Sequence, residues 1–303
     1  MYKLIILDLD GTLLHTDKSI SPYTLHILEK CKARGILIGI ATARGETNAK
    51  NFISRVNPDI IISSGGALIS CRGKFVYAAA FSPEETKRII DTVGILTNGQ
   101  SEITVDTRTS HYWNYKTDPH EIYPDWGEVI YTDYKDFHGE ALKICVETTD
   151  RKTAEKIAES IGDCDFARFS DGDWYKFTKA SATKANALRK VSGMRHLTLD
   201  EIISFGDDYA DMGMLQICGR GVAMGNAIEE VKQAADAITD SNDNDGAAKY
   251  LEKYILEKMN YLSKNCTDSH IALFFANAVH QIQGSGRQLF ELAANDNLPA
   301  AYR

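Results

Sequence analysis

Short apolar runs that suit buried strands alternate along this chain with stretches that have the spacing of amphipathic helices. The alternation begins with a strand over Lys3–Leu9, a helix that starts at Ser21-Pro22, and a strand over Ile36–Ile40. Neighbouring parallel strands need a crossover connection, and helices supply it while covering both faces of the sheet. We therefore expect an α/β protein with a Rossmann-like parallel-sheet core.

The pattern changes in the middle of the chain and then returns. Ser82-Pro83-Glu84-Glu85 has the form of a capping box and predicts the start of a helix. Ile144 and Val146 alternate with other residues at a spacing of two, which predicts half-exposed strands of an open sheet. Helix and strand patterns resume at Thr183–Val191, a helix expected to end at Gly193. The predicted domains are a core of residues 1–81 and 182–256, an inserted α/β cap domain of residues 82–181, and a C-terminal extension of residues 257–303 without an assigned role.

Charge and composition exclude several classes of protein. The chain has 34 lysine and arginine residues against 42 aspartate and glutamate residues, a net charge of −8. Because binding of nucleic acid without sequence preference needs clustered basic charge, we expect no nucleic-acid partner. The sequence contains no run of about 18 apolar residues, so no membrane span is expected either. Any ligand that carries phosphate must therefore be small, and we expect a cytoplasmic monomer or homodimer.

Two carboxylates directly follow the first expected strand. Asp8 and Asp10 stand in the run Asp-Leu-Asp-Gly-Thr, and strand alternation would send both side chains to the same side. Open α/β sheets bind ligands at the carboxyl ends of their strands, and Gly11 allows the chain to turn sharply there. The alternative is a simple Asp-Gly turn with solvated carboxylates.

A second group of carboxylates follows the strand that ends near residue 205. If this strand neighbours the first, Asp207 and Asp211 would lie beside Asp8 and Asp10. Carboxylates gathered in one crevice repel each other unless a cation compensates them. An all-oxygen ligand set suits Mg²⁺ better than zinc. The alternative is that an aspartate here only caps the following helix.

Two further polar residues stand at the ends of strands or the starts of helices. Thr42 follows the second strand, and Lys184 begins a helix. Beside a carboxylate–Mg²⁺ centre, a hydroxyl and an ammonium group would bind the oxygens of a small phosphate. In isolation each residue is uninformative, because such a threonine usually caps a helix and such a lysine is usually solvated. What makes Thr42 and Lys184 candidates for phosphate binding is their order in the chain relative to the two groups of aspartates.

This order resembles that of the haloacid dehalogenase-like hydrolase superfamily. More narrowly, it resembles the Cof-type phosphatases, whose large cap lies between the second and third motifs. The most specific parts are DLDGTL at 8–13 and GDDYADM at 206–212, supported by GVAMGNA at 221–227. The resemblance covers roughly residues 1–256, and the segment between Thr42 and Lys184 is long enough for a cap of about a hundred residues.

The resemblance implies a phosphoric monoester hydrolase that acts through an aspartyl-phosphate intermediate. Asp8 would be the nucleophile, and Asp10 would be the acid and base that protonates the leaving oxygen and then activates water. Thr42 and Lys184 would bind the transferring phosphoryl group. The substrate would be a small phosphomonoester, such as a sugar phosphate or a phosphorylated cofactor.

The same resemblance implies a magnesium site. Mg²⁺ would be held by Asp8, by the backbone carbonyl of Asp10, and by Asp207, with Asp211 as a further ligand or as support for the others. The fourth motif departs from the family pattern at Ala210, which replaces the usual asparagine. The lost amide commonly contacts phosphate or metal-bound water, so an effect on affinity or metal geometry is expected.

Arg44 and Asn226 are weaker candidates for the site, because each lies close to a motif in the sequence. Two alternative functions stay open. A phosphomutase of the phosphomannomutase type shares the motif order and the position of the cap. A non-catalytic protein that binds a phosphorylated ligand is the other.

Overall fold

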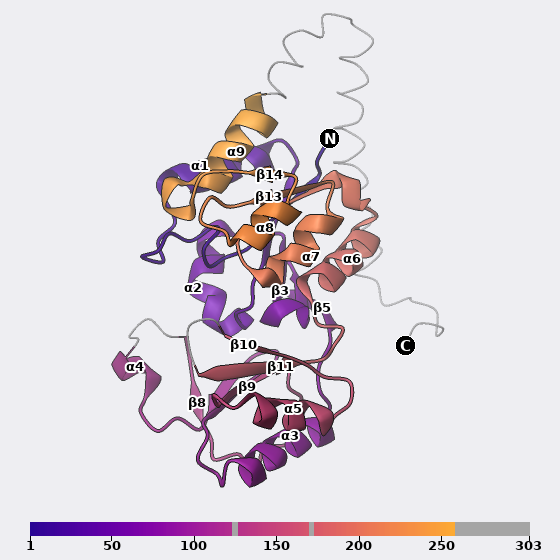
Figure 1. Cartoon of the computed structure of the whole chain (residues 1–303). Helices are drawn as coiled ribbons and strands as arrows, with labels where there is room; N and C mark the ends of the chain where they lie inside the picture. The colour runs from indigo at the N-terminus through magenta and orange to yellow at the C-terminus, as the bar shows by residue number, and fades with distance from the viewer. Residues whose placement is uncertain (123–126, 170–172, 258–303) are drawn as a thin grey trace, which may run out of the picture. The chain divides into compact units, whose positions relative to one another are not determined.

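The computed structural model of the chain describes residues 1–122, 127–169 and 173–257. Met1–Tyr250 form one compact unit that contains two separate sheets, and Leu251 begins a second unit (Figure 1). From residue 258 onward, the predicted C-terminal extension lies outside the described residues.

The larger sheet has eight strands in the order β14-β13-β12-β1-β2-β3-β4-β5. The strands are β1 (Leu4–Leu7), β2 (Leu37–Ala41), β3 (Ile60–Ser63), β4 (Leu68–Cys71), β5 (Lys74–Ala78), β12 (Ile202–Gly206), β13 (Arg220–Ala223) and β14 (Ala237–Ile238). From β14 to β3 the neighbours run parallel. Strands β4 and β5 add an antiparallel hairpin at one edge, which the sequence pattern did not predict.

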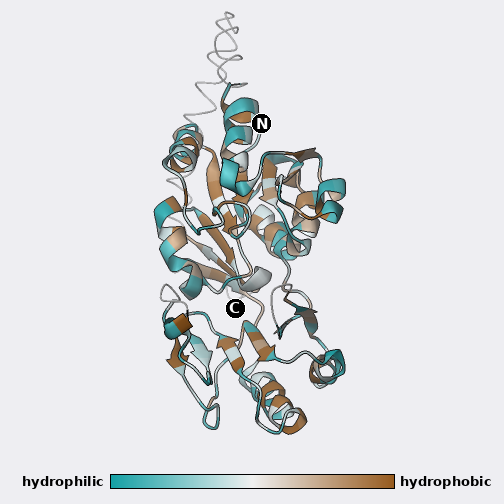
Figure 2. Cartoon of the chain, turned by 60° about the vertical axis from the view of Figure 1, so that its left-hand side comes forward, coloured by the Kyte–Doolittle hydropathy of each residue, from teal (hydrophilic) through white to brown (hydrophobic). Residues whose placement is uncertain are grey.

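Helices connect successive parallel strands: α1 (Pro22–Ala33), α2 (Glu46–Val56), α7 (Tyr209–Ile217) and α8 (Glu229–Ala234). Helix α6 (Lys184–Arg195) leads from the smaller sheet into β12, and α9 (Gly246–Leu251) follows β14. Apolar residues of α6 and α7 pack with those of β1, β3 and β12 in one buried cluster. Figure 2 shows brown, hydrophobic colour along the strands and teal, hydrophilic colour on much of the helices. This is the burial pattern expected of a sheet covered by helices.

The ends of the helices test the capping predictions. The Ser21 hydroxyl accepts a hydrogen bond from the Thr24 amide at 3.0 Å, so α1 begins where predicted. The prediction that the helix after Thr183 ends at Gly193 is wrong. Helix α6 continues to Arg195 and ends at His196, whose backbone is left-handed and whose amide bonds back into the last turn. An interior glycine costs a helix only about 1 kcal/mol, which packing can offset.

The smaller sheet has six strands in the order β10-β11-β9-β6-β7-β8. Its strands are β6 (Ile103–Asp106), β7 (His111–Trp113), β8 (Ile130–Tyr131), β9 (Lys143–Glu147), β10 (Asp165–Arg168) and β11 (Trp174–Thr178), accompanied by α3 (Pro83–Leu96), α4 (Pro119–Ile122) and α5 (Arg151–Glu159). The capping box at the start of α3 is present, since the Ser82 and Glu85 side chains each bond the other's backbone amide.

The central strands of this sheet are not half-exposed as predicted. All of β6 and nearly all of β9 are buried. Helices α3 and α5 cover one face with apolar side chains. The polar side chains of the other face meet the core: Lys143 Nζ donates a hydrogen bond to the Ala43 carbonyl at 3.0 Å. Alternating apolar and polar residues predict that a strand has one apolar and one polar face. They do not predict that a second domain covers the polar face.

The expected fold class, a Rossmann-like core with an inserted α/β cap domain, is confirmed. The chain enters the smaller sheet after Phe81 and leaves it after β11. The domain limits predicted at residues 81, 82, 181 and 182 stay a prediction.

Candidate active site

The predicted site lies at the carboxyl ends of β1 and β12. These strands are parallel neighbours, and their register pairs Leu7 with Phe205. Asp8 directly follows Leu7, and its amide donates to the Phe205 carbonyl at 3.1 Å. Asp207 follows two residues after Phe205. Parallel pairing therefore brings together two carboxylates that are far apart in the sequence.

Gly11 shapes the loop between them. Its φ of +77° is a conformation that L side chains rarely adopt, and a Cβ atom there would lie 2.2 Å from Asp207 Oδ2. The next residue, Thr12, donates from its hydroxyl to Asp207 Oδ1 at 2.9 Å. Only a residue without a side chain allows this close approach of the first loop to Asp207.

Lys184 is buried and joins two carboxylates. Its Nζ atom donates to Asp8 Oδ1 at 2.5 Å and to Asp211 Oδ1 at 2.6 Å. The other oxygen of Asp211 accepts from the backbone amides of Asp207 and Asp208, at 3.1 and 3.2 Å. Asp211 thus holds both the lysine and the loop that carries Asp207.

The electrostatics of this cluster show an excess of negative charge. Burial raises the pKa of Asp8 well above its usual range, and Asp211 and Asp207 raise it further although Lys184 opposes them. Burial and the Asp211 charge raise the pKa of Asp207 to about 6. Burial lowers the pKa of Lys184, but the charges of Asp211 and Asp8 outweigh it and leave it raised. One ammonium group does not neutralise three carboxylates.

This donor set fits a metal ion. One carboxylate oxygen from each of Asp8, Asp207 and Asp211 lies within 4.8 Å of the others. All three donors are oxygen, which is the ligand type preferred by hard divalent cations. A cation here would also compensate the repulsion that raises the pKa of Asp8 and Asp207. The acidic group can therefore hold a divalent metal ion.

Asp10 is not one of these three carboxylates, and its side chain binds two cationic residues instead. Arg44 donates to it from Nε to Oδ2 and from Nη2 to Oδ1, both at 2.6 Å, and Lys18 Nζ donates to Oδ1 at 2.8 Å. Burial raises the pKa of Asp10, but Arg44 and Lys18 more than offset it and leave it lowered. Strand alternation does not set the directions of Asp8 and Asp10, because β1 ends at Leu7 and both aspartates follow it.

The remaining predicted residues, Thr42 and Asn226, form hydrogen bonds between their side chains and backbone groups of nearby loops. The buried Thr42 hydroxyl accepts from the Arg44 amide at 3.1 Å. Asn226 donates to the Gly11 carbonyl at 2.8 Å, and its side-chain oxygen accepts from the Asn242 amide at 2.9 Å. Asn226 thus connects the segment 221–227 with the turn at Gly11.

Sequence reasoning missed Lys18, Asp106 and Lys143. Lys143 Nζ lies 2.9 Å from Asp106 Oδ2, and both residues are buried where the smaller sheet meets the Ala43 loop. The sequence signal was a charged residue at a strand position next to apolar ones. Nothing in the sequence pairs these two strands with each other.

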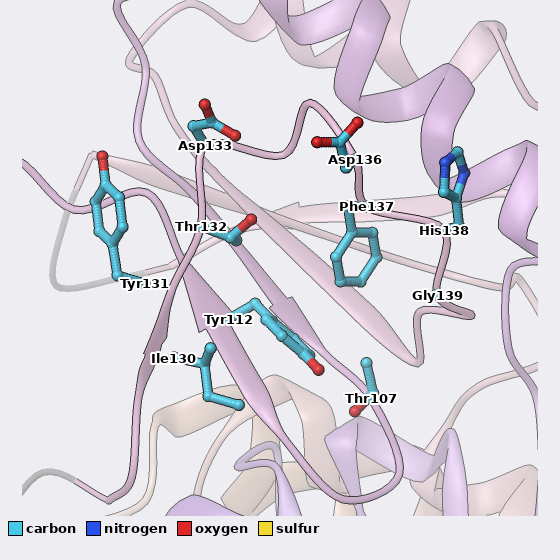
Figure 3. A pocket seen from close by; sticks show the side chains of 10 residues that line it. All are labelled: Thr107, Tyr112, Ile130, Tyr131, Thr132, Asp133, Asp136, Phe137, His138 and Gly139. Carbon is cyan, nitrogen blue, oxygen red and sulfur yellow. The ribbon is translucent and has the colours of Figure 1, made fainter.

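A hollow of about 660 Å³ lies elsewhere on the cap, over β7, β8 and residues 132–139. Figure 3 shows the rings of Tyr112 and Phe137 within it and the carboxylates of Asp133 and Asp136 nearby. The two rings pack edge to face, with their centres 5.1 Å apart. None of the predicted site residues lines this hollow.

A family model described as haloacid dehalogenase-like hydrolase matches residues 5–251. The chain belongs to the haloacid dehalogenase-like hydrolase family. The prediction of an enzyme, a hydrolase of this family, is confirmed. Of the helices in the described residues, none has both the length and the apolar character needed to cross a membrane.

Similar proteins of this hydrolase family include two kinds of named phosphatase. The 5-amino-6-(5-phospho-D-ribitylamino)uracil phosphatase YitU of Bacillus subtilis is 28% identical over 266 residues, which cover 83% of this chain and 97% of that protein. An HMP-PP phosphatase of Yersinia pseudotuberculosis is 27% identical, with 84% of this chain and 96% of that protein covered.

Solved structures of haloacid dehalogenase-like hydrolases share the fold over more than four fifths of this chain. One from Bacteroides thetaiotaomicron has a TM-score of 0.74 and 26% identity, and the match covers 84% of this chain and 99% of that one. A sugar phosphatase described as HAD subclass IIB has a TM-score of 0.71 and 25% identity, with 83% and 98% covered. The expected likeness to the Cof-type, large-cap branch is confirmed.

Proposed function

We propose that this hydrolase is a cytoplasmic, Mg²⁺-dependent phosphatase that hydrolyses small phosphomonoesters through an aspartyl-phosphate. The substrates would be sugar phosphates or phosphorylated cofactors, the kinds of molecule that the relatives' names describe. The observation that carries the proposal is the buried Lys184, bonded to both Asp8 and Asp211 beside Asp207.

In this proposal the nucleophile is Asp8. Its carboxylate oxygen attacks phosphorus and forms an O–P bond while the bond from phosphorus to the leaving oxygen breaks. The ammonium group of Lys184, which already touches Asp8, and the Thr42 hydroxyl bind the phosphoryl oxygens. Because Asp8 is 6% exposed, it lies away from bulk water that would otherwise weaken these interactions.

Asp10 would transfer the protons. Protonated Asp10 gives its proton to the leaving oxygen. As a carboxylate it then takes a proton from a water whose oxygen bonds to phosphorus while the bond from Asp8 to phosphorus breaks and inorganic phosphate leaves. Arg44 and Lys18 stabilise the carboxylate form, which suits the second of these steps. For the first step Arg44 must turn from Asp10, and the incoming phosphate, which accepts the same guanidinium fork, is a competing partner for it.

Mg²⁺ would be held by Asp8, Asp207 and the backbone carbonyl of Asp10, with Asp211 as ligand or support. When bound, it would neutralise the charge on the transferring phosphoryl group. In this structure Asp211 already uses both oxygens to accept hydrogen bonds from Lys184 and from two backbone amides. This favours support as the role of Asp211.

The test is release of inorganic phosphate from a panel of phosphomonoesters, with Mg²⁺ and with a chelator. The Asp8→Asn variant should lose activity, whereas Asp17→Asn, which changes an exposed aspartate nearby, should keep it. Absence of phosphate release from every ester would contradict the proposal. Interconversion of sugar phosphates without release would favour the phosphomutase alternative, and binding without turnover would favour the non-catalytic one.

A further inference from the structure

The cap presents a set of polar side chains on one face of its sheet. Strand β11 pairs with β9 so that Lys176 stands opposite Cys145. Side chains two positions apart in a strand share a face, so Lys143 and Lys176 lie on the same face of the sheet. Figure 1 shows β9 and β11 side by side in the cap.

This face of the cap lies against the catalytic loop that follows β2. Lys143 Nζ donates to the carbonyl of Ala43, which stands between Thr42 and Arg44. Two residues further on, a Cβ atom at Gly45 would lie 3.0 Å from a carboxylate oxygen of Asp106. Lys143 and Asp106 thus hold the polar face of the cap onto the loop that carries a proposed phosphate ligand.

Three lysines differ in how their charges are compensated. Lys184 is bonded to two carboxylates, and Lys143 lies 2.9 Å from Asp106 Oδ2. Lys176 is partly buried, and within the described part of the chain its side-chain ammonium group makes no hydrogen bond or ion pair.

The surroundings of Lys176 are positive. Burial lowers the pKa of Lys176, and the charges of Lys143 and then Lys184 lower it further, against weaker opposing effects of Cys145 and Asp165. Lys176 shares the polar face of the cap sheet with Lys143, which contacts the Ala43 carbonyl next to Thr42. Keeping the Lys176 ammonium group partly out of water and close to other positive charges costs free energy. A bound anion would lower this cost.

We infer that Lys176 is a specificity residue that binds a second anionic group of the substrate, on the leaving-group side. The inference rests on the proposed phosphatase function. Asp8, Thr42, Lys184 and the metal ion serve the transferred phosphoryl group, whereas Lys176 belongs to the cap and is available to the rest of the substrate. The substrate class is a small phosphomonoester whose leaving group carries a second phosphate or a carboxylate.

The experiment compares matched pairs of esters with and without the second anion. Fructose 1,6-bisphosphate against fructose 6-phosphate tests a second phosphate, and 3-phosphoglycerate against glycerol 3-phosphate tests a carboxylate. For wild type, Lys176→Gln and Lys176→Arg, kcat/KM is measured for all four esters. Lys152→Gln, which removes an exposed lysine of helix α5, is the matched control.

Lys176→Gln should lower kcat/KM about tenfold or more for the doubly anionic member of at least one pair, and should change the other member less than about twofold. Lys176→Arg should restore most of the loss, and Lys152→Gln should cause none. Thermal unfolding should show that Lys176→Gln is no less stable than wild type.

Equal losses on both members of each pair, or no loss on any ester, would overturn the inference while leaving the phosphatase function standing. Failure of the wild type to hydrolyse any of the four esters or any other phosphomonoester would overturn both.

Discussion

Arg44 binds Asp10 through two parallel hydrogen bonds, from Nε to Oδ2 and from Nη2 to Oδ1, each 2.6 Å long. The pair joins the loop after β1 to the loop after β2, which also contains Thr42. A planar guanidinium that binds both oxygens of a carboxylate fixes its orientation as well as its charge. Asp10, the proposed acid and base, is therefore held in place by a residue of the loop that follows β2.

Replacement of Arg44 should affect activity more than stability. Because the Asp10 side chain is 37% exposed, Arg44→Gln should cost about 1 kcal/mol or less in the free energy of unfolding at pH 7. We expect kcat to fall about tenfold or more, since Arg44 orients the Asp10 carboxylate that takes a proton from water in the second step. Lys18→Gln, which removes the more exposed cation on the same carboxylate, is the control and should have a smaller effect. Equal activity of Arg44→Gln and wild type would contradict this role.

The stability cost of Lys184→Met should be large. The change leaves Asp8 and Asp211 buried without their cation, and breaking a buried ion pair costs about 3–5 kcal/mol. Urea unfolding at pH 7 measures this loss. The matched control is Lys190→Met on the same helix, where the ammonium group lies over the Tyr77 ring and contributes about 0.5–1 kcal/mol. Similar losses for the two variants would show that Lys184 has no special place in the cluster.

A comparison of Gly11 with Gly35 distinguishes the effect of backbone strain from the effect of a steric clash with Asp207. Both have a φ of +77°, but a Cβ atom would clash with Asp207 at Gly11 and would meet nothing within 4 Å at Gly35. Both alanine variants should lose stability, by about 1–2 kcal/mol, from the positive φ. Only Gly11→Ala should also weaken Mg²⁺ binding, measured by calorimetry. Unchanged Mg²⁺ affinity in Gly11→Ala would contradict the placement of Asp207 in the metal site.

Several parts of the fold and site follow from local sequence. Ser21 and Ser82 begin helices because their side chains accept amide hydrogen bonds within one turn, which is a property of neighbouring residues. Asp8 and Asp207 could be placed at strand ends because buried strands stop where carboxylates begin. Parallel neighbours then bring these ends together.

Other parts depend on long-range pairing that the sequence does not encode locally. The direction of Asp10 depends on where β1 ends and on Arg44, 34 residues away. Lys143 meets Asp106 because β9 happens to pair with β6 in that register. Burial of the cap's polar face requires the second domain, so alternation predicted exposure where the structure has an interface.

Mg²⁺ binding should weaken as the pH falls through about 6. In the metal-free protein the pKa of Asp207 is raised to about 6, from a usual value near 3.9, and metal ligation needs the carboxylate form. Without metal, the raised pKa means that the folded state keeps a proton that the unfolded state has lost. The contribution of Asp207 to stability is therefore present below about pH 4 and is lost as the pH rises through about 6.

This pH dependence can be measured as a shift in melting temperature. Mg²⁺ should raise Tm clearly at pH 7.5, by the equivalent of about 2.7 kcal/mol at a hundred times Kd, and little at pH 5. The variant Asp207→Asn should remove most of the Mg²⁺ effect at both values. A Mg²⁺ effect that is equal at pH 5 and pH 7.5 would contradict the titration of Asp207.

The most direct test of the account is to find the residue that carries the phosphoryl group during turnover. The enzyme is mixed with Mg²⁺ and a hydrolysed ester, quenched with acid, digested and analysed by peptide mass spectrometry after trapping of acyl phosphates. We predict that the trapped phosphoryl group is found on Asp8 in the wild type and on no residue in Asp8→Asn. A phosphoryl group on another residue, or full activity of Asp8→Asn, would contradict the account.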